Sequence, residues 1–337
     1  MDSLVAHGAD AIFGNPGTTE NPVLDGLIDY PQVKYYVALH EGVAVCAASS
    51  YAQASRKTAI ANLHVAPGLG NAIGMMYGSL KAATPVIVTA GSQDTRMRLR
   101  EPVLSHDLIA MAAPVTKWSA EPRMADEIAP IMRRAFKIAN ESPAGPVFVG
   151  LPVNVMEQET DIAAETAGDL YLASRPSAVG VQKLASLLLE SHSPVIFAGD
   201  DVAAQGANVV LTELVELTGA AVYLEFLRAQ QSIAQSHPNL RGRIPLETIG
   251  IHKLLSDHDL VLMIGGPFVE EVWFDPVDCI PGSTVTAQIE SSEERLAKNF
   301  PLAAGLVGHI PTTLKELRDA VAIGANPAYR EQSAARN

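Results

Sequence analysis

A turn rich in glycine and proline is the first part of the chain whose residue types suggest ligand binding. The segment 14–20 reads GNPGTTE and directly follows the short apolar run Ala11–Phe13. Such a turn places backbone N–H groups and a hydroxyl at the carboxyl end of a strand, where open α/β sheets bind ligands. A plain turn in which Thr18 or Thr19 caps the next helix has the same composition. Taken alone, the segment favours this simpler interpretation.

The next candidate is an acidic residue, Glu41, which precedes the apolar stretch 44–52, AVCAASSYA. A carboxylate in the first turn of a helix interacts favourably with the helix dipole. Burial would instead raise the pKa of the carboxyl group and allow it to share a proton with a heterocyclic nitrogen. The sequence leaves both roles open and favours the dipole role.

His64 closes a predicted strand within the segment 62–72, NLHVAPGLGNA. The glycines permit close approach of the backbone to a ligand, and a histidine at this end of a strand can move protons near neutral pH. We expect a Gly/Pro turn after His64 and a helix that begins near Asn71. Gly68-Leu69-Gly70 lacks the third glycine and the acidic residue of a dinucleotide-binding fingerprint. A half-buried structural histidine is an equally good interpretation of His64.

Three further features carry less weight. Arg96, Arg98 and Arg100 lie close together, which is more typical of a solvated loop than of an anion site. His252 and His258 have no third residue at metal-binding spacing, so we predict no metal ligands. The chain has no Gly-x-Ser-x-Gly elbow and no Walker loop, which argues against a hydrolase of that type and against a P-loop enzyme.

The elements that must position these residues follow from an alternation of two kinds of segment. Short, nearly continuous apolar runs predict strands covered on both faces, at Ala11–Phe13, Tyr35–Val37, Thr58–Leu63, Val86–Ala90, Val147–Leu151, Val195–Ala198, Ala221–Leu224, Leu260–Ile264 and Val285–Ile289. Stretches with helical spacing predict helices at Glu20–Asp29, His40–Ala54, Gly70–Ala82, Ala125–Asn140, Val179–Glu190, Asn208–Leu217, Ile249–Leu255 and Thr313–Ala322. This alternation predicts an α/β fold of two doubly wound domains with mainly parallel sheets and right-handed crossovers.

One acidic segment, residues 157–176, interrupts the alternation and contains no clear strand. We interpret it as a linker between a first domain, residues 1–157, and a second domain, residues 174–323. The segment 324–337, GANPAYREQSAARN, is polar and has no apolar period, so we expect a linker or tail there.

The composition bounds the class of protein. With 48 % hydrophobic residues in 337, the chain can bury a sizeable core. Its net charge of −13, from 24 Lys+Arg and 37 Asp+Glu, argues against binding of nucleic acid or anionic membranes. Two distant cysteines exclude a disulfide framework and indicate a reducing compartment. We expect a cytoplasmic protein, since no transmembrane run and no signal peptide is recognisable.

The order and spacing of the motifs resemble the thiamine-diphosphate-dependent 2-oxo-acid decarboxylases, and among them the benzoylformate decarboxylases. The resemblance extends from Gly8 to about Val321 and rests on FGNPGTTE, ALHEG, ASRKTAIANLHVAPGLGNAIG, TPVIVTAGSQ, SPAGPVFVGLPV, HPNLRG and DHDLVLMIGGP. It implies that residues 1–157 bind the pyrimidine half of thiamine diphosphate (a PYR domain). Residues 174–323 would form a central nucleotide-fold-like domain.

The resemblance also implies roles for single residues. Glu41 would protonate the aminopyrimidine ring and so help to deprotonate the thiazolium carbon. Thr18 would bind the carboxylate of the substrate, and His64 would relay protons. The other positions that the resemblance assigns to cofactor binding are Gly17, Pro67, Gly68 and Asn71.

Two departures from this family change what we expect. Val272 stands where benzoylformate decarboxylases have a second active-site histidine, which leaves the substrate open. The Gly-Asp-Gly motif and the later asparagine that bind Mg²⁺ and the diphosphate in the family's C-terminal domain do not occur in these 337 residues. We therefore expect this chain to hold only the pyrimidine half of the cofactor. Mg²⁺ binding and activity would need the C-terminal domain, which we expect to be absent.

The expected partners follow from the same resemblance. They are a small 2-oxo-acid substrate and either further copies of the chain, in a homodimer or tetramer, or a separate C-terminal domain. Two alternatives remain open. One is an acetolactate-synthase-like carboligase, although Phe197–Gly206 shows no convincing flavin signature. The other is a non-catalytic subunit that pairs with a full-length relative.

Overall fold

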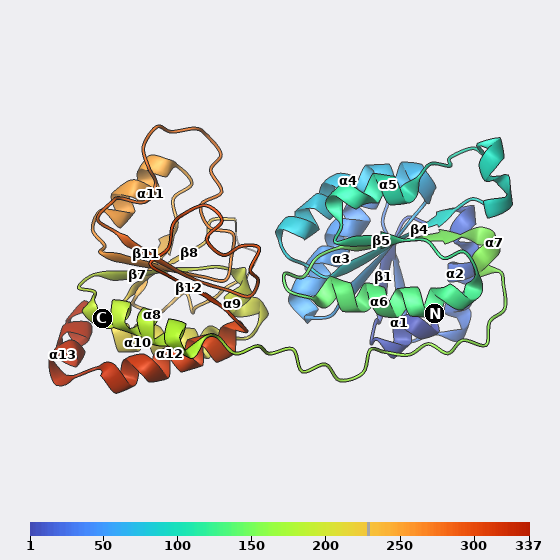
Figure 1. Ribbon diagram of the computed structural model, residues 1–337. Helices are drawn as coiled ribbons and strands as arrows, with labels where there is room; N and C mark the ends of the chain where they lie inside the picture. The colour runs from blue at the N-terminus through green and yellow to red at the C-terminus, as the bar shows by residue number, and fades with distance from the viewer. Residues whose placement is uncertain (228–229) are drawn as a thin grey trace. The chain divides into compact units, whose positions relative to one another are not determined.

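The chain folds into two compact units, Met1–Leu170 and Tyr171–Asn337, in a computed structural model (Figure 1). The structure describes residues 1–227 and 230–337. Residues 159–177 contain no helix or strand, and they include the boundary between the two units. No helix in the described part of the chain has the length and apolar character needed to cross a membrane.

The first unit is built on a six-stranded parallel sheet with strand order β2-β1-β3-β4-β6-β5. The strands are β1 (Ala11–Gly14), β2 (Lys34–Val37), β3 (Ala59–Leu63), β4 (Val86–Ser92), β5 (Trp118–Ala120) and β6 (Val147–Pro152). The helices are α1 (Asp2–Ala6), α2 (Asn21–Gly26), α3 (Glu41–Ser55), α4 (Val65–Lys81), α5 (Leu108–Ala112), α6 (Ile128–Asn140) and α7 (Val153–Met156). Helices α3, α4 and α5 cover one face of the sheet, and α1 and α6 cover the other (Figure 1).

The second unit repeats this architecture with strand order β12-β11-β10-β7-β8-β9, again all parallel. Its strands are β7 (Pro194–Ala198), β8 (Ala221–Leu224), β9 (Leu240–Arg243), β10 (Leu260–Ile264), β11 (Val285–Glu290) and β12 (Ala304–Val307). Its helices are α8 (Ala178–Glu190), α9 (Asp200–Ala204), α10 (Asn208–Thr218), α11 (Thr248–Leu255), α12 (Ile310–Gly324) and α13 (Pro327–Arg336).

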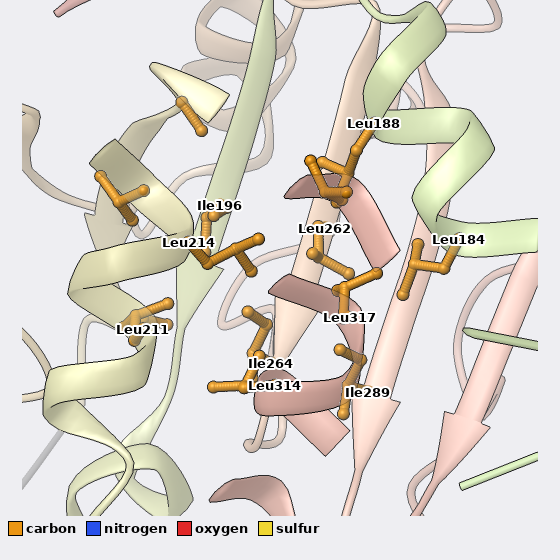
Figure 2. Close-up of a cluster of buried hydrophobic side chains, with 14 of the residues drawn as sticks. Leu184, Leu188, Ile196, Leu211, Leu214, Leu262, Ile264, Ile289, Leu314 and Leu317 are labelled. Atoms are coloured by element: carbon orange, nitrogen blue, oxygen red, sulfur yellow. The ribbon is translucent and has the colours of Figure 1, made fainter. Parts of the chain in front are cut away.

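Buried side chains from alternate strand positions fill both faces of each sheet, as expected for parallel strands. Figure 2 shows one such layer in the second unit, where leucines of α8, α10 and α12 pack on isoleucines and a leucine of β7, β10 and β11. The opposite face of this sheet packs against Ile251 and Leu255 of α11. These two-sided cores explain why the strands appear in the sequence as unbroken apolar runs.

The predicted fold class is confirmed, and each of the nine predicted strands corresponds to an observed one. Three observed strands, β5, β9 and β12, lie outside the predicted set, and all three are edge strands. Their residues are mostly half-buried or exposed. An edge strand pairs on one side only and needs no continuous apolar run, so its pattern is weak.

Two predictions are wrong, one about the start of a helix and one about the C-terminal segment. Helix α4 begins at Val65, not near Asn71, and the N–H of Gly68 donates to the carbonyl of His64 at 2.9 Å. Pro67 is compatible with this start because N–H groups in a first turn have no partner within the helix. Residues 327–336, expected as part of a linker or tail, form α13. Its Tyr329 is buried against the core of the second unit, and one buried aromatic ring can anchor a helix whose other residues are polar.

The strand order creates one position at which a ligand site is expected in the first unit. The chain leaves β1 toward β2 on one side and returns to β3 on the other side of β1. In doubly wound folds ligands bind outside the carboxyl ends of the strands at such a switch point. The loop 14–20 follows β1 and His64 follows β3, so both lie at this edge.

Candidate functional site

The site is assembled at the carboxyl ends of β1, β2 and β3 in the first unit. The loop 14–20 contributes residues to two separate hydrogen-bonded groups. One group surrounds Glu41, at the start of α3, and the other surrounds Glu20, at the end of the loop. The N–H of Asn15 donates to the carbonyl of Asn62 in β3 at 3.2 Å, which ties the loop to the neighbouring strand.

Glu41 is buried, with 6 % of its surface exposed, and its two carboxylate oxygens are held by two different amides. Asn15 Nδ2 donates to Oε1 at 3.1 Å, and Asn71 Nδ2 donates to Oε2 at 2.9 Å. One amide comes from the loop after β1 and the other from α4. The carboxylate is therefore fixed between two elements, and it keeps acceptor capacity for a further donor.

Helix α4 can lie against this carboxylate because it carries a glycine at the contact. A Cβ on Gly68 would lie 3.1 Å from Glu41 Oε1, a tight contact. Pro67, one residue earlier, is exposed, as is the side chain of Asn71 on the next turn. The predicted cofactor-binding residues Gly68 and Asn71 thus contact Glu41 itself, whereas Pro67 faces solvent.

The pKa of Glu41 is lowered, whereas the proton-sharing role in the sequence analysis supposed a raised one. Burial raises this pKa, but the hydrogen bonds from Asn71, the backbone and Asn15, together with the charge of His40, lower it by more. Donors to an ionised carboxylate stabilise the charged form. Glu41 is therefore an anion at neutral pH in the chain without a ligand.

Glu20 is the most enclosed charged group of the site, with none of its surface exposed. Four donors surround its carboxylate: the N–H groups of Gly17 and Gly91, the hydroxyl of Thr19 and the ring of His64, at 2.7, 2.8, 2.7 and 2.8 Å. A buried carboxylate needs such compensation, since its desolvation costs several kcal/mol.

The Glu20 contact fixes the orientation of His64. A carboxylate only accepts hydrogen bonds, so the proton of the 2.8 Å contact lies on His64 Nδ1. The Nε2 atom then remains for other partners, and the side chain of His64 is 28 % exposed. A Cβ on Gly17 would fall 2.2 Å from atoms of this ring, so only glycine allows the imidazole to lie against the loop.

The backbone of Val65, directly after His64, is held in an uncommon conformation. Val65 has φ of 42°, in the left-handed region that β-branched residues rarely adopt. Such strain persists only where surrounding structure imposes it, and it gathers at functional sites. Here it lies at the junction of β3 and α4, next to the residue that contacts Glu20.

The structure places the predicted site residues as follows. Gly68 and Asn71 both contact Glu41, and Gly17 and His64 belong to the second group. Thr18 is exposed at the start of the same turn, while its neighbour Thr19 is buried against Glu20 and His64.

Asn15, Thr19 and Glu20 belong to these groups but are not among the predicted site residues. Glu20 accepts from the N–H of Gly17 three residues earlier, which is half of a capping box, and that spacing was a readable signal. Its contact with His64 spans 44 residues and left no local pattern.

The less weighted features lie apart from this site. Arg96 and Arg98 lie after β4 and pair with Asp94 and with Glu121, which follows β5. His252 and His258 contact backbone carbonyls of the second unit. Val272 is exposed there. Within residues 1–227 and 230–337, no three or more His, Cys, Asp or Glu side chains gather so as to hold a metal ion.

Two family models match the chain. Residues 1–111 match the thiamine pyrophosphate enzyme N-terminal TPP binding domain, and residues 181–317 match the thiamine pyrophosphate enzyme central domain. Both groups around Glu41 and Glu20 lie within the first match.

Individual proteins agree with these matches. The chain is 31 % identical to a benzoylformate decarboxylase of Pseudomonas aeruginosa over 96 % of its own length and 61 % of that protein. It is 27 % identical to an acetolactate synthase of Mycobacterium bovis, covering 94 % of this chain and 51 % of that protein. The solved thiamine diphosphate-dependent 4-hydroxybenzoylformate decarboxylase of Rhodococcus jostii superposes with a TM-score of 0.85 at 30 % identity, over 94 % of this chain and 60 % of that one.

The chain thus spans about half to three fifths of the length of these relatives. With both of its folded units matched, the chain belongs to the thiamine pyrophosphate enzymes, and it carries an N-terminal TPP binding domain and a central domain of that family.

Proposed function

We propose that this chain provides the aminopyrimidine-binding and proton-transfer part of a thiamine-diphosphate-dependent enzyme that decarboxylates a 2-oxo acid of the benzoylformate type. The observation that carries the proposal is the buried carboxylate of Glu41 between the amides of Asn15 and Asn71, on the same sheet edge as the Glu20–His64 pair. When bound, thiamine diphosphate would supply a nucleophilic carbon for the substrate carbonyl and a sink for the electron pair left when CO2 departs.

Glu41 is the residue that would hold the aminopyrimidine ring. Its buried carboxylate keeps acceptor capacity on both oxygens, and Gly68 leaves room beside Oε1. A ring placed here would remove the remaining water and raise the pKa of the carboxyl group, which favours sharing a proton with a ring nitrogen. Gly17, Pro67 and Asn71 would form the surrounding wall.

His64 is the residue that would move protons to and from the substrate. Glu20 fixes the Nδ1 proton and orients the ring, so the exchangeable position is Nε2. Thr18 would donate its exposed hydroxyl to the carboxylate of the 2-oxo acid, at the turn that also holds Gly17. These roles need the loop 14–20 and the start of α4 to stay fixed relative to each other.

The diphosphate and Mg²⁺ would be held by protein groups other than these. Mg²⁺ prefers several oxygen ligands, and the part of the chain that the structure describes gathers no such cluster of acidic side chains. We expect the remaining length of the relatives, in another segment or another subunit, to supply these groups. A homodimer or tetramer is the expected assembly.

A carboligase of the acetolactate synthase type is the second candidate, because the chain is also similar to such an enzyme. In the second unit, the buried carboxylates of Asp201 and Glu290 lie near the switch point between β7 and β10. The negative charge of Asp201 disfavours the pyrophosphate of a flavin nucleotide there. Product analysis with pyruvate and with benzoylformate separates the two candidates, since only the carboligase yields acetolactate.

The proposal is tested with Glu41→Gln, which keeps the shape of the side chain but cannot share the proton. Calorimetric titration with thiamine diphosphate and Mg²⁺ should show affinity at least ~10-fold weaker than that of the wild-type chain, the cost of one charge-assisted hydrogen bond. CO2 release from benzoylformate is measured after mixing the chain with the separately expressed remaining third of a relative. His64→Ala should lower this rate by about 10²–10⁴-fold while binding stays close to wild type.

The matched control is Glu190→Gln, which removes an exposed carboxylate at the end of α8 in the second unit. It should leave both binding and CO2 release unchanged. Equal binding and equal activity of Glu41→Gln and the wild-type chain would refute the proposed function.

A further inference from the structure

Glu41 is held by a pair of amides, which we call the amide clamp: Asn15 Nδ2 on Oε1 and Asn71 Nδ2 on Oε2. The amides come from different elements, the loop after β1 and helix α4. Each can rotate an oxygen or a nitrogen toward its neighbour, but a carboxylate offers only acceptors, so both present their NH2 groups. The clamp therefore favours the ionised form of Glu41 over the protonated form.

The surroundings of Glu41 add one charge to this geometry. His40, at the N-terminal cap of α3, is the titratable group among the described residues whose charge acts on Glu41, and protonated His40 favours the anion. In the neutral ring Nδ1 accepts from the N–H of Gly42 at 3.0 Å, a contact that the protonated ring cannot keep. Helix α4 contributes Gly68 and Asn71 at this contact, both uncharged. The amide clamp and the first-turn N–H groups of α3 therefore lower the pKa of Glu41, as the charge of His40 does.

We propose that Asn15 and Asn71 are positioning residues that fix Glu41 as an anion before any ring binds, so that an aminopyrimidine binds together with one proton drawn from solvent. This rests on the proposed function for the identity of the ring. In the free chain the carboxylate carries no proton. In the complex one proton lies between a Glu41 oxygen and a ring nitrogen. It is taken from water or buffer, so the site gains one proton for each ring bound.

The clamp is tested first without any ligand. In the full chain labelled with ¹³C at the glutamate side-chain carboxyl carbons, the Glu41 resonance is assigned by its absence in Glu41→Gln. Its titration midpoint should lie below those of exposed glutamates. It should move upward in Asn71→Ala and in Asn15→Ala, because each loses one donor. It should move furthest in Asn71→Asp, which keeps the shape but places a second negative charge beside Glu41.

Two further variants separate the clamp from general effects. Asn140→Ala removes an amide that contacts Thr58 and the Phe136 carbonyl, and it should leave the Glu41 midpoint unchanged. His40→Gln removes the imidazole charge and should raise the midpoint less than Asn71→Asp does. If all clamp variants fold, as judged by circular dichroism, and titrate like the wild-type chain, the inference is wrong. Asn15→Asp serves in place of any variant that fails to fold.

The second measurement follows proton uptake on binding. Titration with thiamine diphosphate and Mg²⁺ in buffers of different ionisation enthalpy should give about one proton taken up per ring near pH 8. This uptake falls at lower pH, and the fall should begin at higher pH in Asn71→Ala. Binding without proton uptake overturns the inference and leaves the proposed function standing. If the wild-type chain binds nothing even when it is mixed with the separately expressed remaining third of a relative, the proposed function fails, while the carboxylate titration still decides the role of the clamp.

Discussion

At the scale of single residues, the two carboxylates of the site have different surroundings. Glu20 has no exposed surface and accepts four hydrogen bonds, one of them from His64. Glu41 accepts one hydrogen bond from a side-chain amide on each oxygen, and 6 % of its surface is exposed. A fully satisfied carboxylate is suited to orient a neighbour, whereas one with free lone pairs can bind a further donor. We therefore propose that Glu20 orients His64 and that Glu41 contacts a ligand.

Gly17→Ala tests how closely the His64 ring depends on the loop. The added Cβ would lie 2.2 Å from ring atoms, so the imidazole or the loop must move. Overpacking of this kind destabilises by about 1–3 kcal/mol. We expect that loss in the first unit and loss of the His64–Glu20 contact. Urea unfolding is followed by Trp118 fluorescence in a Trp273→Phe background, because Trp118 and Trp273 are the two tryptophans of the chain. An unchanged free energy of unfolding would contradict this prediction.

At the scale of elements, α4 serves the site at one end and is ordinary helix at the other. Its first turns contain the strained Val65, Gly68 against Glu41, and Asn71. Gly74, near its middle, is exposed, and a Cβ there would meet no atom within 4 Å. The glycines of α4 thus have different surroundings, although the sequence does not distinguish them. Only the contact at Gly68 relates to the site.

Gly74→Ala should stabilise the first unit by about 0.5–1 kcal/mol, because alanine loses less conformational entropy than glycine in a helix. Gly68→Ala is the matched variant within α4. Its Cβ would press on Glu41 Oε1 at 3.1 Å and offset that gain. The same Trp118 unfolding assay compares the two. Equal stabilisation by both substitutions would show that the Gly68 contact is not tight.

At the scale of the whole molecule, the two units repeat one architecture but place different groups at their switch points. The first unit has Glu41 and His64 at the carboxyl ends of its strands. The second has Asp201 and Glu290, which lie near the loops containing Gly199 and Gly266. Glu290 has no exposed surface. Its Oε2 has no hydrogen-bond partner among the described residues, as suits a carboxyl group that is neutral.

Glu290 should make the stability of the second unit depend on pH. Burial raises the pKa of this carboxyl group from 4.5 to about 7, assisted by Asp201 and opposed by Gln288, Arg295 and Gly266. Between these values the folded state binds more protons than the unfolded state, so stability falls as pH rises toward 7 and then levels off. Glu290→Gln cannot ionise and should be more stable by roughly 1–3 kcal/mol at pH 8.5.

The measurement is urea unfolding followed by circular dichroism at pH 5, 6.5 and 8.5. The unfolding transition that Trp118 fluorescence does not report is assigned to the second unit. The difference between Glu290→Gln and the wild-type chain should grow mainly between pH 5 and 7.5. Burial also raises the pKa of Glu225 to about 7, so Glu225→Gln in parallel separates the two contributions. A difference that does not vary with pH would contradict the neutral form of Glu290.

The sequence by itself determined the parallel α/β fold, because strands covered on both faces must be apolar along their whole length, as β3 and β4 are. It also marked Glu41, His64 and the loop 14–20 as candidates, since polar and glycine residues directly after such runs stand out. Edge strands such as β9 were not predicted, because a strand that is half in solvent needs no apolar run.

Only the tertiary structure decided which of these side chains meet. Glu20 contacts His64 across 44 residues, and Glu41 contacts Asn15 and Asn71 across 26 and 30. These contacts exist because β1 pairs with both β2 and β3, which brings the loop 14–20, the start of α3 and the start of α4 to one edge of the sheet. Local residue patterns report backbone preference and burial. The pairing of distant strands depends on the packing of the whole unit, and it is this pairing that turns separate polar residues into a site.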